Sequence, residues 1–219
     1  MAHPPGSSVP PEGVTPAAAS AAGAAPGARG ADAAPSRAEI EAVRARDAAA
    51  LGRFFERYVN RVFGLTLRLV GERALAEDIT QEVFLRVHRA AHTLDPERDP
   101  GPWVMTIAHN LCRDVWRSGA YRMGRQSESL DGDPAAAERL SSGINQPERD
   151  HERSERERVV QDALLALPEH LRAVIVLHDY EGLGHEEIAR SLGIEHAAAR
   201  KRYSRALAAL AGLLEGKVE

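Results

Sequence analysis

Apolar side chains recur at spacings of three and four residues along two stretches of this chain, which is the pattern of a helix with one buried face. Leu51, Tyr58, Val62 and Leu65 follow this spacing in the first stretch. The one β-like run, residues 173–177, falls within a helical period of the second stretch. The pattern therefore predicts an all-α protein.

Three helical segments are expected in the first stretch. The first begins near Ala38 and continues without interruption to Gly71, a residue type that often ends helices. The second covers residues 75–91, LAEDITQEVFLRVHRAA, and ends before the Pro- and Gly-rich run DPERDPGP. The third covers residues 103–118 and has Pro102 at its start, a favoured first-turn position.

Two segments lack this periodicity. Residues 1–36 are built from Ala, Pro, Gly and Ser with hardly any large apolar side chain, so we expect a disordered tail. Residues 122–155 mix Gly, Pro, Ser and acidic side chains, which favours a flexible acidic linker. The sequence therefore predicts two small helical domains, at residues 38–121 and 156–215.

Charge is distributed unevenly, although the formal net charge is only -4. Between Gln126 and Glu157, nine acidic residues outnumber four arginines. From Arg190 to Arg205, five basic residues accompany a single glutamate. A basic surface that suits nucleic acid can therefore exist on an acidic protein.

The run HEEIA, which begins at His185, raises the question of a zinc-peptidase helix. Such a helix needs a second His one turn after the first, and Ala189 occupies that position. His88 and His92 share a helical face without a third ligand nearby, which favours a surface or packing pair. We therefore expect no metal, no cofactor and no catalytic residue, which means that the protein is not an enzyme.

Cys112 is the single cysteine, which excludes a disulfide framework or a Cys-rich zinc module within the chain. We expect it to be a small buried or half-buried side chain. No apolar run approaches the roughly 18 residues that cross a bilayer, and the N-terminus lacks a secretory signal. A cytoplasmic protein without membrane insertion is expected.

Residues 185–192 and the segment after them have the pattern of a helix-turn-helix. Ile188 and Leu192 face inward, and the small Ala189 lets a second helix approach. Gly193 supplies the turn. The second helix has an apolar stripe of Ala199, Tyr203, Ala206, Leu207, Leu210, Leu213 and Leu214, and an outward face of Arg200, Lys201, Ser204 and Ala208 with Arg205 at its side. Such a helix suits the DNA major groove, and a solvated basic helix end is the alternative.

The helix at residues 103–118 has a core side and a polar side. The polar side carries three residues at helical spacing, Asn110, Asp114 and Arg117. Arg113 and Trp103 add positive charge and aromatic surface, a combination that suits single-stranded nucleic acid. Trp103 and Trp116 also fit as core residues, so the pattern alone leaves both roles open.

Three segments, taken in order, resemble the bacterial extracytoplasmic-function sigma factors, the compact two-domain members of the sigma-70 family. They are AEDITQEVFLRVHRA, PWVMTIAHNLCRDVWR and LALPEHLRAVIVLHDYEGLGHEEIARSLGI. The resemblance covers about residues 47–125 and 156–214. It implies a protein that binds core RNA polymerase through the beta and beta-prime subunits, guides it to promoter DNA and helps to open the DNA. It also implies an anti-sigma factor as a partner.

The resemblance assigns roles to residues at matching positions. It implies contacts with core polymerase by Asp78, Gln81, Glu82 and Leu85. It implies contacts with unpaired bases of the -10 element by Arg98, Trp103, Asn110, Arg113, Asp114 and Arg117. It implies contacts with the -35 element by His196, Arg200, Lys201, Arg202, Ser204 and Arg205. The acidic linker resembles the connector that threads through the polymerase in the family.

The entry to the last helix departs from the family pattern. The family usually has a Thr-Val-Lys-Ser-Arg-like run there, and this chain has Ala198 to Arg202, AARKR. The -35 preference is therefore the least transferable part of the resemblance. Two alternatives remain: a helix-turn-helix regulator that binds duplex DNA without polymerase, and an enzyme with an appended DNA-binding domain.

Overall fold

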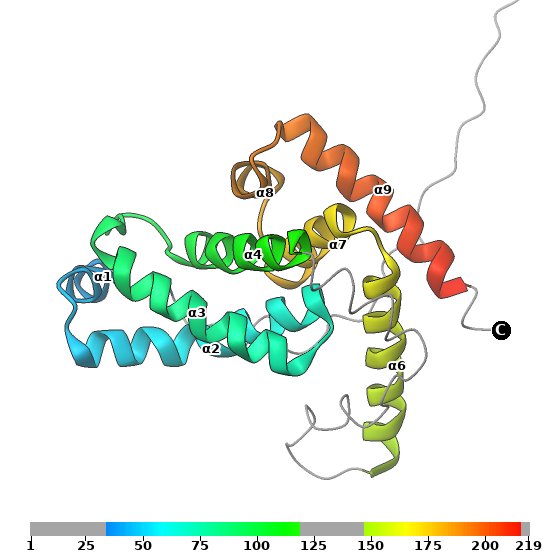
Figure 1. The fold of residues 1–219 in the computed structure, drawn as a ribbon, viewed down its shortest axis with the longest axis horizontal. Coiled ribbons are helices and arrows are strands. Elements are labelled where there is room, and N and C mark those ends of the chain that lie inside the picture. Colours follow the sequence, from blue (N-terminus) through cyan, green and yellow to red (C-terminus); the bar gives the residue numbers. More distant parts are fainter. Residues whose placement is uncertain (1–33, 119–146, 216–219) are drawn as a thin grey trace, which may run out of the picture.

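A computed structural model describes residues 34–118 and 147–215, with side chains at 34–118 and 155–215. Every regular element in these residues is helical, which confirms the all-α prediction (Figure 1). The N-terminal half contains α1 (Arg37–Arg44), α2 (Ala48–Val70), α3 (Arg73–Ala90), the short 3-10 helix η2 (Ala91–Thr93) and α4 (Gly101–Arg117). The C-terminal half contains α6 (Pro147–Ala166), α7 (Glu169–Ile175), the π-helical turn η6 (Val176–Tyr180), α8 (His185–Leu192) and α9 (His196–Glu215).

The first predicted helix is in fact two helices, so the expectation of an uninterrupted helix was wrong. Asp47 caps α2, because its carboxylate accepts the backbone N–H of Ala50 at 2.8 Å. Arg46, just before it, has a φ of 61°, which lies outside the helical region. The chain therefore changes direction between α1 and α2.

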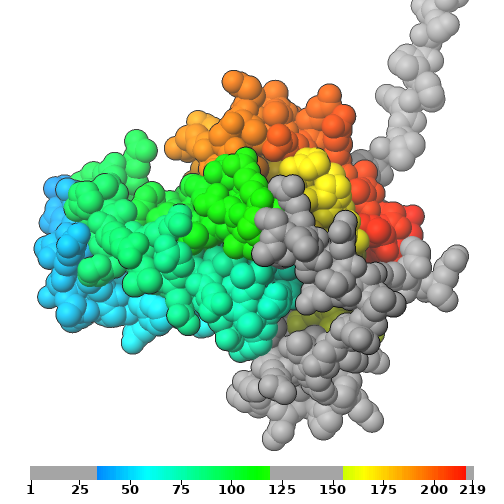
Figure 2. Space-filling view, viewed as in Figure 1, coloured from blue at the N-terminus to red at the C-terminus, as the bar shows by residue number. Residues whose placement is uncertain are grey.

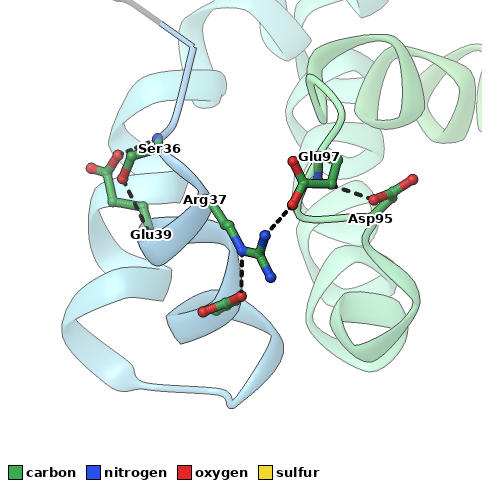
Figure 3. Close-up of polar contacts among 6 residues, drawn as sticks. Ser36, Arg37, Glu39, Asp95 and Glu97 are labelled. Atoms are coloured by element: carbon green, nitrogen blue, oxygen red, sulfur yellow. Dashed lines mark hydrogen bonds and ion pairs between the residues drawn. The ribbon is translucent and has the colours of Figure 1, made fainter.

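α1 begins with a capping box (Figure 3). The hydroxyl of Ser36 accepts the backbone N–H of Glu39 at 3.3 Å, and the Glu39 carboxylate accepts the N–H of Ser36 at 2.7 Å. Arg37 pairs with Glu97 in the loop before α4, and Asp95 accepts the backbone N–H of Glu97 at 3.0 Å. α1 therefore helps to hold the loop that leads into α4.

The N-terminal core forms where α2, α3 and α4 pack against one another. Its fully buried side chains include Tyr58, Val62, Leu65, Leu69, Val83, Val104, Met105 and Ala108. Gly71 ends α2 with a φ of 83°, a left-handed conformation that glycine adopts without a steric cost, so the predicted stop is confirmed. Pro102 lies in the first turn of α4, also as expected.

The C-terminal half starts earlier than the predicted domain boundary, because α6 begins at Pro147, within the segment expected to be linker. The predicted tail up to residue 33 and residues 119–146 of the linker region lie outside the described residues. Pro168 stands directly before α7, which matches the predicted helix start. Leu164, Leu167, Leu171, Ile175 and Ala206 form a core between α6, α7 and α9.

The two halves pack against each other, which the sequence did not predict. Val174, Leu177 and Ile188 of the C-terminal half belong to the same buried cluster as the core of the N-terminal half. Arg61 of α2 pairs with Glu181 at 3.2 Å, and burial raises the pKa of that carboxyl. The described residues therefore form one packed body (Figure 2).

Arg172 of α7 is the main polar group of this contact, and it is 1% exposed. Its guanidinium donates to the carbonyls of Leu165 and Leu167 at the end of α6, at 2.8 and 3.0 Å, and also to the carbonyl of Leu69 in α2. Because carbonyls at helix C-termini carry partial negative charge, a buried cation is favourable there. Arg172 thus links the last turns of α2 and α6.

Candidate nucleic-acid interface

The helix-turn-helix is formed as the sequence predicted. Gly193 has a φ of 64° and ends α8, and Glu187 closes the start of α8 by accepting the N–H of Gly184 at 2.9 Å. Ala189 of α8 and Ala199 of α9 are both buried, and the two helices are in contact.

The outward face of α9 is cationic and exposed. The side chains of Arg200, Lys201, Ser204 and Arg205 are exposed, as is His196, and Arg202 is half-buried. Among the described residues, no carboxylate forms an ion pair with Arg200, Lys201 or Arg205. These cations remain available to an anionic partner, which is the property that binding to DNA phosphates requires.

One member of the predicted apolar stripe was wrong. Leu207 is 41% exposed, whereas its neighbour Ala206 is fully buried. Successive residues on a helix point about 100° apart, so Leu207 is turned away from the side of α9 on which Ala206 is buried. Leu207 therefore adds an apolar side chain to the outer surface of α9.

The candidate -10 residues on α4 are less accessible than those on α9. Asp114 and Arg117 are exposed near the end of the helix, whereas Asn110 and Arg113 are half-buried. Trp103 is also half-buried. The polar side of α4 is therefore open mainly at its C-terminal end.

α8 covers the other end of this polar side. The hydroxyl groups of Thr106 in α4 and Ser191 in α8 are hydrogen-bonded, and the two helices are in contact (Figures 1 and 2). Thr106 precedes Asn110 by one turn, so the contact lies on the same helical stripe. The C-terminal half thus shields part of the candidate -10 surface.

Two further aromatic and basic positions surround α4. Trp116 is buried at 5% exposure, which decides between the two roles that the sequence left open for it. Arg98 is exposed in the preceding loop and pairs with Asp95 at 3.1 Å. This loop is the one that Arg37 of α1 helps to hold, so Arg98 projects from a positioned segment.

The candidate polymerase contacts lie along α3. Asp78, Gln81 and Leu85 are exposed, and Glu82 is half-buried and pairs with Arg86 at 2.9 Å. Leu85 is 52% exposed, so its apolar side chain is accessible beside these polar residues.

A shallow apolar hollow lies on the side of α3 that faces α2. Its lining consists of Leu51, Phe54, Phe55, Phe84, Val87 and His88. The rings of Phe55 and Phe84 lie 4.7 Å apart. Phe55 is 46% exposed, whereas its neighbour Phe54 is buried.

The ionisable groups buried in the N-terminal core are neutral. Burial raises the pKa of the Cys112 thiol to about 12 and lowers the pKa of His109 to about 4, with a smaller contribution from Arg113 to the latter. Among the described side chains, no three His, Cys, Asp or Glu residues gather closely enough to hold a metal ion. None of the described helices has the length and apolar character needed to span a bilayer.

Comparison with known families identifies both halves. The sequence matches the profile of Sigma-70 region 2 over residues 54–122 and that of Sigma-70 region 4 over residues 157–210. Region 2 thus covers most of α2 together with α3 and α4, and region 4 covers the second half of α6, α7, α8 and most of α9.

Curated relatives agree with this match. The chain is 37% identical to the RNA polymerase sigma factor CarQ of Myxococcus xanthus over 166 residues, which span 75% of this chain and 88% of CarQ. It is 38% identical to the ECF RNA polymerase sigma factor SigE of Mycolicibacterium smegmatis over 149 residues, 68% of this chain and 55% of SigE. It is 33% identical to BldN of Streptomyces coelicolor, over 80% of this chain and 64% of BldN. The chain thus spans little more than half the length of SigE and BldN.

Two solved structures share the fold. The complex of CnrH with the cytosolic domain of CnrY gives a TM-score of 0.58 at 23% identity, over 82% of this chain and 97% of that chain. The sigma factor RpoE from Bartonella quintana, in complex with the anti-sigma factor NepR, gives 0.58 at 19% identity, over 75% of this chain and 96% of that chain.

Proposed function

Because the chain belongs to the extracytoplasmic-function sigma factors of the sigma-70 family, we propose that it binds core RNA polymerase in the cytoplasm and directs promoter-specific initiation. In this proposal the domain of residues 38–121 binds the polymerase and the -10 element, and the domain of residues 156–215 binds the -35 element. Its proposed role is to position RNA polymerase on the promoter, and it carries out no catalytic step itself.

The observation that carries the proposal is the exposed, unpaired cationic face of α9 on a chain with a net charge of -4. Arg200 and Arg205 suit guanine edges in the major groove, and Lys201 suits a phosphate. Ser204 lies between them on the same face and suits either group. Arg202 and His196 lie at the border of this face, where the DNA backbone would pass.

The polar side of α4 is proposed to hold the unpaired -10 strand. Arg113 and Arg117 supply positive charge for its phosphates, and Asn110 and Asp114 supply hydrogen-bonding groups for bases. Trp103 and the Arg98 loop stand at the N-terminal end of this surface, where a base turned out of the stack would be received.

Core polymerase is proposed to bind the exposed side of α3. Asp78, Gln81 and Glu82 form a polar and acidic border beside Leu85 and the aromatic hollow of Phe55 and Phe84. A helix of the polymerase clamp with apolar residues along one side and basic residues along the other fits this surface. The beta-prime subunit is the proposed partner here, and the beta subunit is the proposed partner of the C-terminal domain.

An anti-sigma factor is proposed as a further partner. The sigma factor RpoE of Bartonella quintana was solved with the anti-sigma factor NepR. The fold that this chain shares with RpoE supports an anti-sigma factor as a partner of this chain.

Transcription in vitro tests the proposed function. Purified core polymerase, with and without the full chain, is given a library of bacterial genomic fragments, and transcript start sites are mapped. The proposal expects new start sites that share two sequence elements and depend on the chain. Specific binding to duplex DNA without any core-dependent transcript would instead identify a helix-turn-helix regulator that acts without polymerase.

A further inference from the structure

Three histidines, one each from η6, α8 and α9, lie close together. The rings of His178 in η6 and His185 at the start of α8 are stacked, with centroids 4.7 Å apart. His196, at the start of α9, lies 6.5 Å from His185. The ring of Tyr203 completes the group, at 4.3 Å from His178 and 5.2 Å from His185. These three imidazoles are called the histidine cluster below.

The histidine cluster borders the cationic face of α9. His196 is exposed and precedes Arg200 by one helical turn, so both side chains lie on the same stripe. Arg200 is also close enough to act electrostatically on His185. A DNA phosphate that approaches Arg200 therefore approaches the imidazoles as well.

One carboxylate faces the cluster from η6. Asp179 accepts the hydroxyl of Tyr203 at 2.8 Å, and its same oxygen lies 2.7 Å from Nδ1 of His178. The Asp179 oxygen is thus already shared between two partners. It compensates only part of the charge that three protonated imidazoles would bring.

His185 is disfavoured as a cation in the free protein. Burial lowers its pKa most, and the neighbouring His178, His196 and Arg200 lower it further, against the weaker opposite effect of Asp179. Among the described residues, its buried Nδ1 atom has no hydrogen-bond partner. An additional anion nearby would therefore favour protonation of His185.

We propose that the histidine cluster lies at the edge of the DNA-contacting surface and takes up protons when DNA binds. An approaching phosphate promotes protonation of the imidazoles, so promoter binding strengthens as the pH falls from 8 to 6. This inference rests on the proposed function, because it requires α9 to lie on DNA. Linkage fixes the sign: if the DNA-bound form holds more protons than the free form, a higher proton concentration favours binding.

Imidazoles are the groups of this surface that change charge in that pH range. Burial raises the pKa of Tyr203 to about 12, so its hydroxyl keeps its proton. The other groups on the three elements are of types that keep their charge between about pH 6 and 8. They are Asp179 on η6, Arg190, Glu186 and Glu187 on α8, Glu195 in the turn, and Arg200, Lys201, Arg202, Arg205 and Glu215 on α9. Burial also raises the pKa of Tyr180 on η6, so its hydroxyl keeps its proton as well.

The test measures promoter affinity against pH at constant ionic strength. Holoenzyme assembled from core polymerase and the full chain is titrated with a labelled duplex that carries the mapped -35 element but no -10 element. For the unmodified chain, affinity should rise by about tenfold between pH 8 and pH 6, the change expected when roughly half a proton is taken up over two pH units. In His185→Gln and His196→Gln, the ratio of the two affinities should fall to about threefold or less.

The control is His92→Gln, an exposed histidine in η2 of the N-terminal half, which should keep the tenfold ratio. An equal affinity at both pH values for the unmodified chain, or an unchanged ratio in His185→Gln and His196→Gln, would overturn the proposal.

A second measurement uses the unmodified chain, so it remains valid if a histidine variant fails to fold. The imidazole resonances of His185 and His196 are titrated by NMR in the free chain and with the same duplex at a concentration that is first shown, by fluorescence anisotropy, to saturate the chain. The pKa values should rise on addition of DNA, and unchanged values would contradict the proposal. Failure of the proposed function gives a different result: Arg200→Ala with Lys201→Ala would then bind the duplex as well as the unmodified chain at every pH.

Discussion

The two helices assigned to DNA differ in accessibility. On α9, Arg200, Lys201 and Arg205 are exposed and face away from the packed core. On α4, α8 lies against Thr106, and Asn110 is half-buried. Under the proposed assignments, the -35 surface on α9 is accessible in this structure. The -10 surface on α4 becomes fully accessible only when α8 moves away from α4.

The largest effect is expected at the residue that joins the two halves. Arg172→Ala leaves several buried carbonyls of α2 and α6 without their donor, which should lower the free energy of unfolding by about 4 kcal/mol. Urea denaturation measures this change. Arg190→Ala, an exposed arginine on α8, is the control and should change it by about 0.5 kcal/mol or less.

A loss below about 1 kcal/mol in Arg172→Ala would show that the buried hydrogen bonds of Arg172 contribute little to stability. Arg172→Lys should give an intermediate loss, because the ammonium group keeps the charge but cannot reach all the carbonyls. Such a variant also keeps the test useful if Arg172→Ala fails to fold.

The second effect is a loss of stability at low pH, which should arise from His109 of α4 in the N-terminal core. The pKa of His109 falls from its ordinary 6.5 to about 4, mainly through burial. Because the folded-state pKa is lowered, the native state binds the proton less tightly than the unfolded state. The related stability is therefore present above pH 6.5 and is lost as the pH falls towards 4, by about 3 kcal/mol.

Urea denaturation at pH 7, 6, 5 and 4 checks this dependence. His109→Gln should show a shallower loss than the unmodified chain, and the exposed His92→Gln should follow the unmodified chain. Parallel curves for His109→Gln and the unmodified chain would contradict the role of His109.

The third effect tests the open surface. Arg200→Ala with Lys201→Ala removes one base-reading and one phosphate-binding group, which should lower promoter-specific initiation by about fiftyfold. Core polymerase binding should not change, and the salt dependence of promoter binding should become weaker. Arg44→Ala with Arg53→Ala, two exposed arginines of α1 and α2, is the matched control. Normal promoter selection by the α9 variant would refute the placement of the -35 surface.

The smallest effect is expected on polymerase binding. Charge reversal by Asp78→Lys with Glu82→Lys should weaken the affinity of the chain for core polymerase by about tenfold, through lost electrostatic complementarity. A fluorescence titration of labelled chain with core enzyme measures it, with Glu41→Lys on α1 as the control. Unchanged affinity would remove these two residues from the contact.

Most of the helices could be predicted, because their spacing pattern is long and regular. The break before α2 was missed, since it depends on one left-handed residue, Arg46, and one N-cap, Asp47, within a continuous pattern. The packing of the halves was also missed. The bonds of Arg172 to Leu69 and of Arg61 to Glu181 join residues more than 100 positions apart, which no local pattern encodes.

The outward face of α9 could be predicted because helical geometry alone separates Arg200 and Lys201 from the buried Ala199. The sequence analysis assigned Leu207 to the apolar stripe, although the same geometry turns it away from the buried Ala206. The shielding of α4 could not be predicted, since it depends on where the C-terminal half packs.

Site-specific crosslinking tests the central claim that two surfaces of one chain contact one promoter at two places. A photoreactive amino acid at Ser204 of α9 or at Asp114 of α4 is incorporated into the full chain, which is assembled with core polymerase on a mapped promoter. The account predicts that position 204 crosslinks to duplex DNA at the -35 element and position 114 to the non-template strand at the -10 element. Crosslinks from position 204 without core polymerase, together with none from position 114 in its presence, would contradict it.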